Sequence, residues 1–225
     1  MSPLLPCIEI ETAPNPAFAV IWLHGLGADG NDFVPLVPEL ALDDAPPLRF
    51  VFPHAPQIPV TGNGGYVMRA WYDILSFEGL NRRVDEAGIL ASRAAVGRLI
   101  ERENERGIPS HRIFLAGFSQ GGAMAYTTGL TYAATLAGII ALSAYLPAPH
   151  LITEALSEAN RGTPIFAAHG TQDEILPLPL GEQAAAFARQ CGNPLVWHTY
   201  PMPHAVCAEE IAALAVWLKA RLRAQ

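Results

Sequence analysis

A serine stands between two glycines in the segment GFSQG at residues 117–121, which follows an apolar run and precedes a helical one. A serine at a sharp strand-to-helix turn holds its hydroxyl above the sheet, and glycines flank it because a Cβ would clash in so tight a turn. The Gln120 amide would open the helix, where unpaired N–H groups and the helix dipole favour an oxyanion. The spacing predicts that Ser119 is a nucleophile and that the Gln120 amide is one oxyanion donor.

A serine hydroxyl needs a base to take its proton and usually an acid to orient that base. At a turn of this kind the chain order is Ser, acid, His. Asp173 is the only aspartate after Ser119, and it lies just past the apolar run at 164–168. We therefore expect Asp173 to be the acid. Glu174 is the weaker alternative because its extra methylene changes its reach, and a turn or helix-capping role for Asp173 stays open.

Four histidines of the C-terminal half are candidates for the base. His198 lies inside a predicted strand, His150 lies in a proline-rich loop, and His169 is close to the aspartate in sequence. His204 follows a predicted strand and precedes the last predicted helix, which would place it at the same rim as the serine. We therefore expect His204 to be the base, with a capping or surface role as the alternative.

A second oxyanion donor should come from the loop after the first parallel strand, which reads HGLGADG at residues 24–30. The glycines would let the Leu26 amide turn toward the serine, and His24 would support this loop. The same residues match the dinucleotide fingerprint G-x-G-x-x-G. However, the second predicted strand does not end in an acidic residue, and Pro35 and Pro38 interrupt the following segment. We expect no cofactor and no metal, because no His/Cys/Asp/Glu cluster has metal-ligand spacing.

Short apolar runs alternate with longer helical stretches along the chain. Strands apolar at successive positions and separated by helices predict an α/β fold, with a mostly parallel sheet and helices on both faces. Residues 8–12 would add an antiparallel edge strand. The predicted strands are Phe18–Leu23, 48–52, 112–118, 137–143, 164–168 and Leu195–Tyr200, and the predicted helices are 85–106, 120–130, Leu178–Gln190 and 206–223.

The segment 53–83 does not follow this alternation, because it is rich in proline and glycine and has no clear period. Long ordered loops in compact domains are usually functional. Trp71, Tyr72, Ile74 and Leu75 are therefore candidates for a substrate pocket, although a core role fits them equally well. We expect an open cleft that this loop borders.

The composition excludes several classes of protein. The chain has 225 residues, of which 51% are apolar and 16% charged, which fits one folded domain over 1–225 and excludes a disordered chain. A net charge of −7 with scattered arginines disfavours nucleic acid as a partner. The N-terminus lacks the features of a secretory signal, and the apolar runs are too short to span a membrane. Three widely spaced cysteines fit reduced thiols, so we expect a cytoplasmic protein without stable membrane insertion.

Several motifs occur in order from about residue 18 to 222: VIWLHGLGADG, FPHAP, RIFLAGFSQGGAMA, AAHGTQDEILP and YPMPHAV. Together they resemble the bacterial carboxylesterase and acyl-protein thioesterase family, also labelled phospholipase/carboxylesterase. The resemblance implies an α/β-hydrolase fold, a loop around Trp71 that borders the substrate, and a homodimer. It also implies a triad of Ser119, Asp173 and His204. We expect no separate cap domain, because the interval from Ser119 to Asp173 holds no insertion long enough for one. Pro203 departs from the motif, which often has Gly there.

We expect a serine hydrolase that cleaves carboxylic esters with short to medium acyl chains through an acyl-enzyme on Ser119. Acyl-protein thioesterase or lysophospholipase activity is the alternative, because these substrates share the catalytic apparatus and differ in the pocket. The partner would be a small-molecule ester or thioester. A non-catalytic protein on the same fold and a dinucleotide binder are the less favoured hypotheses.

Overall fold

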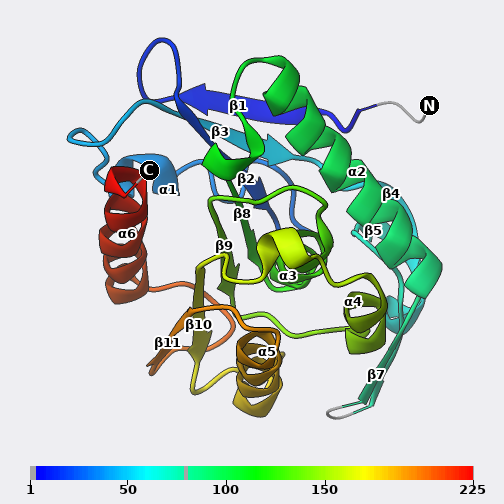
Figure 1. The fold of residues 1–225 in the computed structure, drawn as a ribbon. Coiled ribbons are helices and arrows are strands. Elements are labelled where there is room, and N and C mark those ends of the chain that lie inside the picture. Colours follow the sequence, from blue (N-terminus) through cyan, green and yellow to red (C-terminus); the bar gives the residue numbers. More distant parts are fainter. Residues whose placement is uncertain (1–3, 79–80, 225) are drawn as a thin grey trace.

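The computed structural model describes residues 4–78 and 81–224, and its centre is a seven-stranded sheet with the order β1-β3-β2-β8-β9-β10-β11 (Figure 1). All neighbouring strands are parallel except β1, which pairs antiparallel with β3 at one edge. The mostly parallel sheet and the antiparallel edge strand confirm the sequence-based prediction. The strands are β1 Cys7–Glu11, β2 Phe18–Leu23, β3 Leu48–Pro53, β8 Ile113–Phe118, β9 Gly138–Leu142, β10 Ile165–Gly170 and β11 Leu195–Tyr200.

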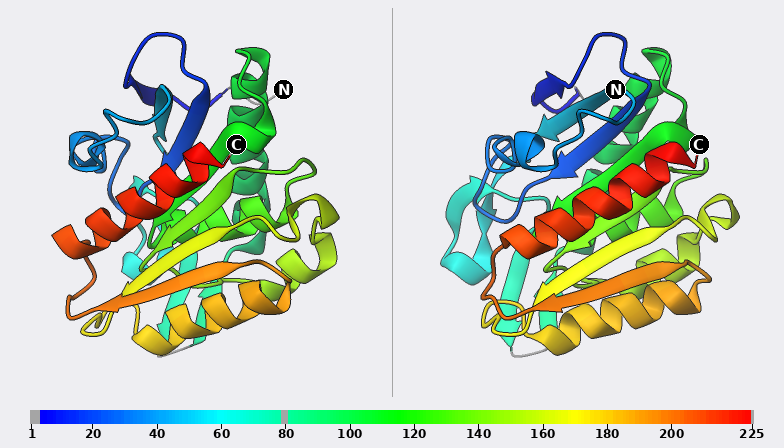
Figure 2. Two further views of the ribbon diagram at one scale, coloured as in Figure 1. Left: turned by 60° about the vertical axis from the view of Figure 1, so that its left-hand side comes forward. Right: turned by 90° about the vertical axis from the view of Figure 1, so that its left-hand side faces the viewer.

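Helices cover both faces of this sheet, as predicted (Figure 2). One apolar cluster joins the sheet to α2, α3, α4 and α5, and a second joins the other face to α1 and α6. Strands β2, β3, β9 and β10 are buried at every position, which is why their sequences are apolar without alternation. The helices are α1 Leu36–Glu39, α2 Glu86–Glu105, α3 Gln120–Thr131, α4 Pro149–Ala155, α5 Leu178–Gln190 and α6 Ala208–Arg223.

The segment 53–83 is not the irregular loop that the sequence suggested, because most of it forms two β-hairpins. The first pairs β4 Gln57–Val60 with β5 Tyr66–Arg69, and the second pairs β6 Ile74–Glu78 with β7 Asn81–Val84. These strands are short and lie outside the central sheet, so they lack the fully apolar pattern that marks its strands. Pro59 within β4 also argued against predicting a strand there, since proline in sheets is expected only in edge strands.

A network of ion pairs lies at the amino ends of the parallel strands. Glu103 of α2 has a fully buried side chain and pairs with Arg49 of β3 at 2.7 Å, with Arg102 at 3.0 Å and with Arg106 at 2.9 Å. Glu9 and Glu11 of β1 pair with the same arginines. We call these six residues the Glu103 network.

The carboxyl ends of the parallel strands lie together at the end of the sheet opposite the Glu103 network. We call this end the carboxyl edge of the sheet, and the end with the Glu103 network the amino edge. The segments that follow β2, β8, β10 and β11 therefore come together, and these segments carry His24, Ser119, Asp173 and His204. Open α/β sheets bind their ligands at the carboxyl edge. Within the described part of the chain, no helix is both long and apolar enough to span a lipid bilayer.

Candidate active site

Ser119 occupies the turn between β8 and α3 in a strained conformation. Its φ of 55° and ψ of −119° lie in a region that residues other than glycine rarely adopt. The turn is so tight that a Cβ on Gly121 would lie 2.1 Å from the carbonyl oxygen of Leu23. The Ser119 amide donates to the Leu142 carbonyl at 2.9 Å, which ties the turn to the end of β9. The neighbouring strands therefore hold the hydroxyl above the sheet edge.

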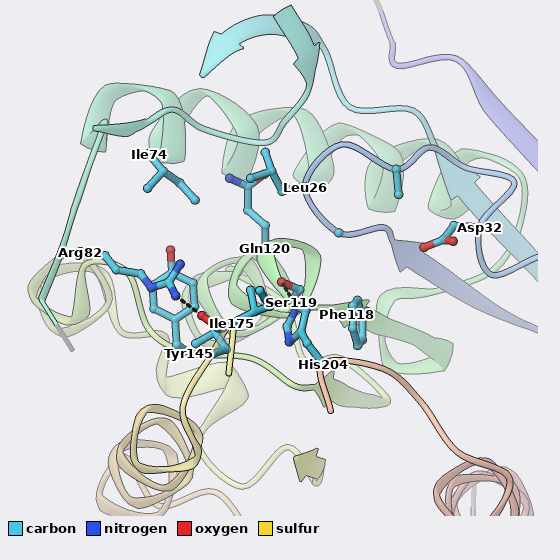
Figure 3. Close-up of a pocket in the computed structure, with 13 residues that line it drawn as sticks. Leu26, Asp32, Ile74, Arg82, Phe118, Ser119, Gln120, Tyr145, Ile175 and His204 are labelled. Carbon is cyan, nitrogen blue, oxygen red and sulfur yellow. Dashed lines mark hydrogen bonds between the residues drawn. The ribbon is translucent and has the colours of Figure 1, made fainter. Parts of the chain in front are cut away.

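His204 lies within hydrogen-bond distance of both other residues of the expected triad. Its Nε2 is 2.8 Å from Ser119 Oγ (Figure 3), and its Nδ1 is 2.6 Å from Asp173 Oδ2. With a proton on Nδ1 donated to the carboxylate, Nε2 is free to accept the serine proton. The ring of Phe118 packs against the imidazole at a centroid distance of 4.8 Å, which restrains the orientation of His204.

Asp173 makes contacts that suit both an acid and a turn residue. Its Oδ1 accepts hydrogen bonds from the amides of Ile175 at 3.0 Å and Leu176 at 2.7 Å, while Oδ2 faces His204. Burial by itself raises the pKa of Asp173, but the hydrogen bonds from His204 and Leu176 outweigh burial and lower the pKa below its usual value. The carboxylate therefore stays ionised, and the turn role that the sequence left open coexists with the contact to His204.

His169 lies beside Asp173 at the carboxyl end of β10. Its Nε2 is 2.7 Å from the Leu176 carbonyl and 3.4 Å from Asp173 Oδ2. The side chain is fully buried, and burial lowers the pKa of His169, so the ring is neutral at pH 7. With Nε2–H donated to the Leu176 carbonyl, His169 fixes the turn that carries the acid. Its closeness in sequence to Asp173 did not suggest this role.

The other two histidine candidates lie away from the serine. The ring of His198 of β11 lies tilted against that of Phe166, at a centroid distance of 5.4 Å. His150 is exposed, and its Nε2 is 3.2 Å from Glu86. Among the described residues, His204 is the one histidine within hydrogen-bond distance of Ser119.

The two expected oxyanion donors lie beside the serine. Leu26 and Gln120 both line the cavity at Ser119, and in the described part of the chain neither amide nitrogen donates to another backbone group (Figure 3). His24 supports the Leu26 loop, as the sequence predicted. Its Nε2 accepts from the Ala55 amide at 3.1 Å, and its Nδ1 is 2.7 Å from the Gly25 carbonyl. Burial lowers the pKa of His24 to about 4, so the ring is neutral at pH 7.

The cavity above Ser119 has a volume of about 210 Å³. Of the four pocket candidates from segment 53–83, Ile74 lies in its wall, whereas Leu75 is 37% exposed and is not in the wall. Trp71 and Tyr72 are buried behind the wall. Their polar atoms explain this correction, because both find partners in the core: Trp71 Nε1 donates to the His24 carbonyl, and the Tyr72 hydroxyl is 2.9 Å from that of Tyr145.

Several lining residues were not predicted from the sequence. Ile175 and Leu176 lie two and three residues after Asp173. Tyr145 lies just past the end of β9, so its position at a strand's carboxyl end was an available signal. Arg82 of β7 reaches the cavity, donates to the Ile175 carbonyl and lies over the Tyr145 ring at 5.5 Å. Nothing in the sequence indicated that contact. The described lining is Gly25, Leu26, Ala28, Asp32, Ile74, Arg82, Phe118, Ser119, Gln120, Tyr145, Ile175, Leu176 and His204.

The described residues include no group of three or more His, Cys, Asp or Glu side chains arranged to hold a metal ion. The cysteines Cys7, Cys191 and Cys207 are free thiols, and none of them lines the cavity. At this edge the serine, the histidine and the carboxylate form one hydrogen-bonded chain, with the amides of Leu26 and Gln120 beside the serine.

A mostly parallel sheet with a Ser–His–Asp chain at its carboxyl edge defines the class of α/β hydrolases. Comparisons with known proteins place the chain within that class. The family model described as Phospholipase/Carboxylesterase matches residues 6–222. The chain therefore belongs to the phospholipase/carboxylesterase family, and it is a hydrolase.

Named relatives refine this placement. The chain is 41% identical to acyl-protein thioesterase 1 of Neurospora crassa, over 97% of this chain and 91% of the relative. It is 37% identical to acyl-protein thioesterase 1 of Cryptococcus neoformans, over 96% and 98%. The crystal structure of Arabidopsis thaliana SOBER1 superposes with a TM-score of 0.84 at 32% identity, covering 91% of this chain and 99% of that one. These curated relatives are fungal, which corrects the bacterial assignment expected from the sequence.

Proposed function

We propose that this protein is a serine hydrolase of the acyl-protein thioesterase type, which cleaves acyl thioesters and also accepts oxygen esters. One observation carries the proposal: Ser119, His204 and Asp173 form a continuous hydrogen-bonded chain at the floor of a mostly apolar cavity. The preference for thioesters over the ester substrates expected from the sequence is supported by relatives named acyl-protein thioesterase 1.

The first half-reaction transfers the acyl group to the protein. His204 Nε2 takes the proton of Ser119 Oγ as the oxygen attacks the acyl carbonyl, and Asp173 stabilises the imidazolium that forms. The amides of Leu26 and Gln120 then stabilise the tetrahedral oxyanion. The loss of one such donor in a related type of site costs about 3 kcal/mol of transition-state stabilisation.

The leaving group explains why one site serves both substrate types. A thiol with a pKa of about 8.5 departs readily as an anion and then takes the proton from His204, whereas an alcohol must receive that proton as its bond breaks. Water then attacks the acyl-enzyme, His204 accepts its proton, and the acid is released as the proton returns to Ser119 Oγ. Both half-reactions use the same three side chains and require no further group.

A matched substrate panel tests the proposal. Acyl chains of increasing length are presented as thioesters and as oxygen esters of the same acid, and kcat/KM is measured for each. We expect turnover of both series, with a higher kcat/KM for the thioester at each length. If the protein cleaved the oxygen esters but none of the thioesters, it would be a carboxylesterase and the thioesterase assignment would be wrong.

The nucleophile is tested with Ser119→Ala, which we expect to lower kcat about a millionfold while leaving the folded state intact. A fluorophosphonate probe should label the wild-type protein at Ser119 and leave the variant unlabelled. Retained turnover in Ser119→Ala would refute the covalent route.

The assembly and location of the protein complete the proposal. We propose a homodimer that works on small-molecule or protein-bound acyl groups in the cytoplasm, as the sequence led us to expect. Light scattering on the purified protein checks the first part, because a monomer mass of 24.1 kDa at micromolar concentration would contradict it.

A further inference from the structure

The side chain of Gln120 is held at two points by the backbone of the preceding hairpin region. Its Oε1 accepts from the Trp71 amide at 2.7 Å, and its Nε2 donates to the Tyr72 carbonyl at 2.9 Å. Gln120 is only 2% exposed, so neither bond competes with solvent. Because the side chain cannot turn, the backbone of Gln120 is fixed in relation to residues 71–72.

The same segment also holds the loop that carries Leu26. The Trp71 indole Nε1 donates to the His24 carbonyl at 2.9 Å, and the Gly27 amide donates to the Arg69 carbonyl at 2.9 Å. These two hydrogen bonds hold the loop at His24 and at Gly27, on either side of Leu26. Residues 69–72 thus contact both loops that carry the proposed oxyanion donors, and we call them the oxyanion bracket.

We propose that Trp71 is a positioning residue that sets the spacing between the Leu26 and Gln120 amides. It is not in the cavity wall, so it acts through its contacts with His24 and Gln120. Donors aligned in advance stabilise an oxyanion strongly because they need no rearrangement as charge develops, and a small displacement weakens them. This inference rests on the proposed function, since it concerns the same oxyanion.

Trp22 offers a matched control for the same substitution. Like Trp71 it is a buried indole, with 1% of its surface exposed, but its Nε1 has no hydrogen-bond partner among the described residues. It stacks on Phe33 at a centroid distance of 5.3 Å and belongs to the cluster on the other face of the sheet. Trp22→Phe therefore removes a comparable part of the core without removing a contact to the site.

The experiment compares Trp71→Phe with Trp22→Phe. It measures kcat and KM for a p-nitrophenyl ester, and the affinity for an alkyl boronic acid, which forms an anionic tetrahedral adduct with a serine oxygen. In Trp71→Phe we expect kcat to fall about 10- to 100-fold, below the effect of deleting a whole donor. KM should stay within threefold, and boronate affinity should fall by the same factor as kcat. Trp22→Phe should leave all three within twofold.

Equal kcat values for the two variants would overturn the positioning role, as would a boronate affinity that does not change in Trp71→Phe. Gln120→Met removes the two hydrogen bonds that the Gln120 side chain makes with residues 71 and 72. If Trp71→Phe proves too unstable to purify, this variant must show equal losses in kcat and in boronate affinity.

Hydrogen exchange separates this inference from the proposed function. The amides of residues 24–27 should exchange faster in Trp71→Phe than in Trp22→Phe, whether or not the protein turns over an ester. Absence of turnover in the wild type would refute the function alone, and unchanged exchange in this loop would refute the bracket alone.

Discussion

The two edges of the central sheet are held together by different kinds of contact. At the amino edge, the Glu103 network gathers three arginines and two further glutamates around the fully buried carboxylate of Glu103. At the carboxyl edge, His24, His169 and Gln120 bind backbone groups through short neutral hydrogen bonds. The network of buried ion pairs therefore lies at the edge away from Ser119.

This difference has a physical reason. Ion pairs attract over several directions and tolerate small displacements, whereas neutral hydrogen bonds to backbone groups are directional and fix a geometry. A serine hydrolase needs donors and a base placed to within a fraction of an ångström, and extra charges near His204 would also disturb the proton transfers. We expect mutations at the two edges to affect different properties.

The largest effect is expected at the carboxyl edge, from His204→Ala. The variant lacks the base that accepts the Ser119 proton, so kcat should fall by about 10⁵- to 10⁶-fold with a similar free energy of unfolding. His198→Ala is the matched control, because His198 lies in β11 beside Phe166 and makes no contact with the serine. Steady-state ester hydrolysis measures both. Loss of activity in His198→Ala as well would show that the base was misassigned.

At the amino edge, Glu103→Gln should change stability without changing activity. The substitution leaves three arginines with one fewer negative charge, and breaking the buried Arg49–Glu103 pair in this way costs about 3–5 kcal/mol. Urea unfolding measures this loss, and kcat for the folded variant should stay within twofold of the wild type. A parallel fall in kcat would mean that the two edges are coupled.

The smallest effect is a dependence on pH at the carboxyl edge. Because burial lowers the pKa of His24 to about 4, the unfolded chain binds a proton at this residue below pH 6.5 while the folded chain does not. Stability should therefore fall as the pH drops from about 6.5 to about 4, by up to about 3 kcal/mol from this one group. Urea unfolding between pH 4 and 7 measures it.

The control for this pH dependence is His24→Asn, whose amide oxygen still accepts a hydrogen bond but does not titrate. The wild-type slope minus the variant slope isolates His24 from other groups such as His169, whose pKa is also lowered by burial. Identical slopes would contradict the role given to His24.

The central sheet and the long helices could be predicted from the sequence because the burial of their residues requires regular patterns of apolar side chains. Strand Phe18–Leu23 and helix Leu178–Gln190 match the predicted bounds, and the stripe of Ile89, Val96 and Leu99 indicated α2. The short helices α1 and α4 were missed because four and seven residues show too little periodicity. The hairpins of segment 53–83 were missed because the two strands of each hairpin pair only with each other and not with the central sheet.

The candidate triad followed from local chemistry and chain order, but its supports did not. Nothing in the sequence relates Trp71 to His24 or His169 to Leu176, because these contacts depend on how separate loops meet in three dimensions. Trp71 was a pocket candidate because it lies in the long segment 53–83 and because the family resemblance placed its loop at the substrate, with a core role fitting it equally well. In the structure, the buried indole N–H of Trp71 donates to the His24 carbonyl, and this contact holds Trp71 in the core and not in the cavity wall.

The contact between Gly121 and the end of β2 limits how this protein can evolve. Because a Cβ on Gly121 would lie 2.1 Å from the Leu23 carbonyl, any side chain at position 121 would force the backbone at the end of β2 to move. Ile74 and Ile175 in the cavity wall already carry side chains, so a substitution there places no new Cβ against the backbone. A mutagenesis library aimed at new substrates therefore belongs in the cavity wall, while Gly121 is left unchanged.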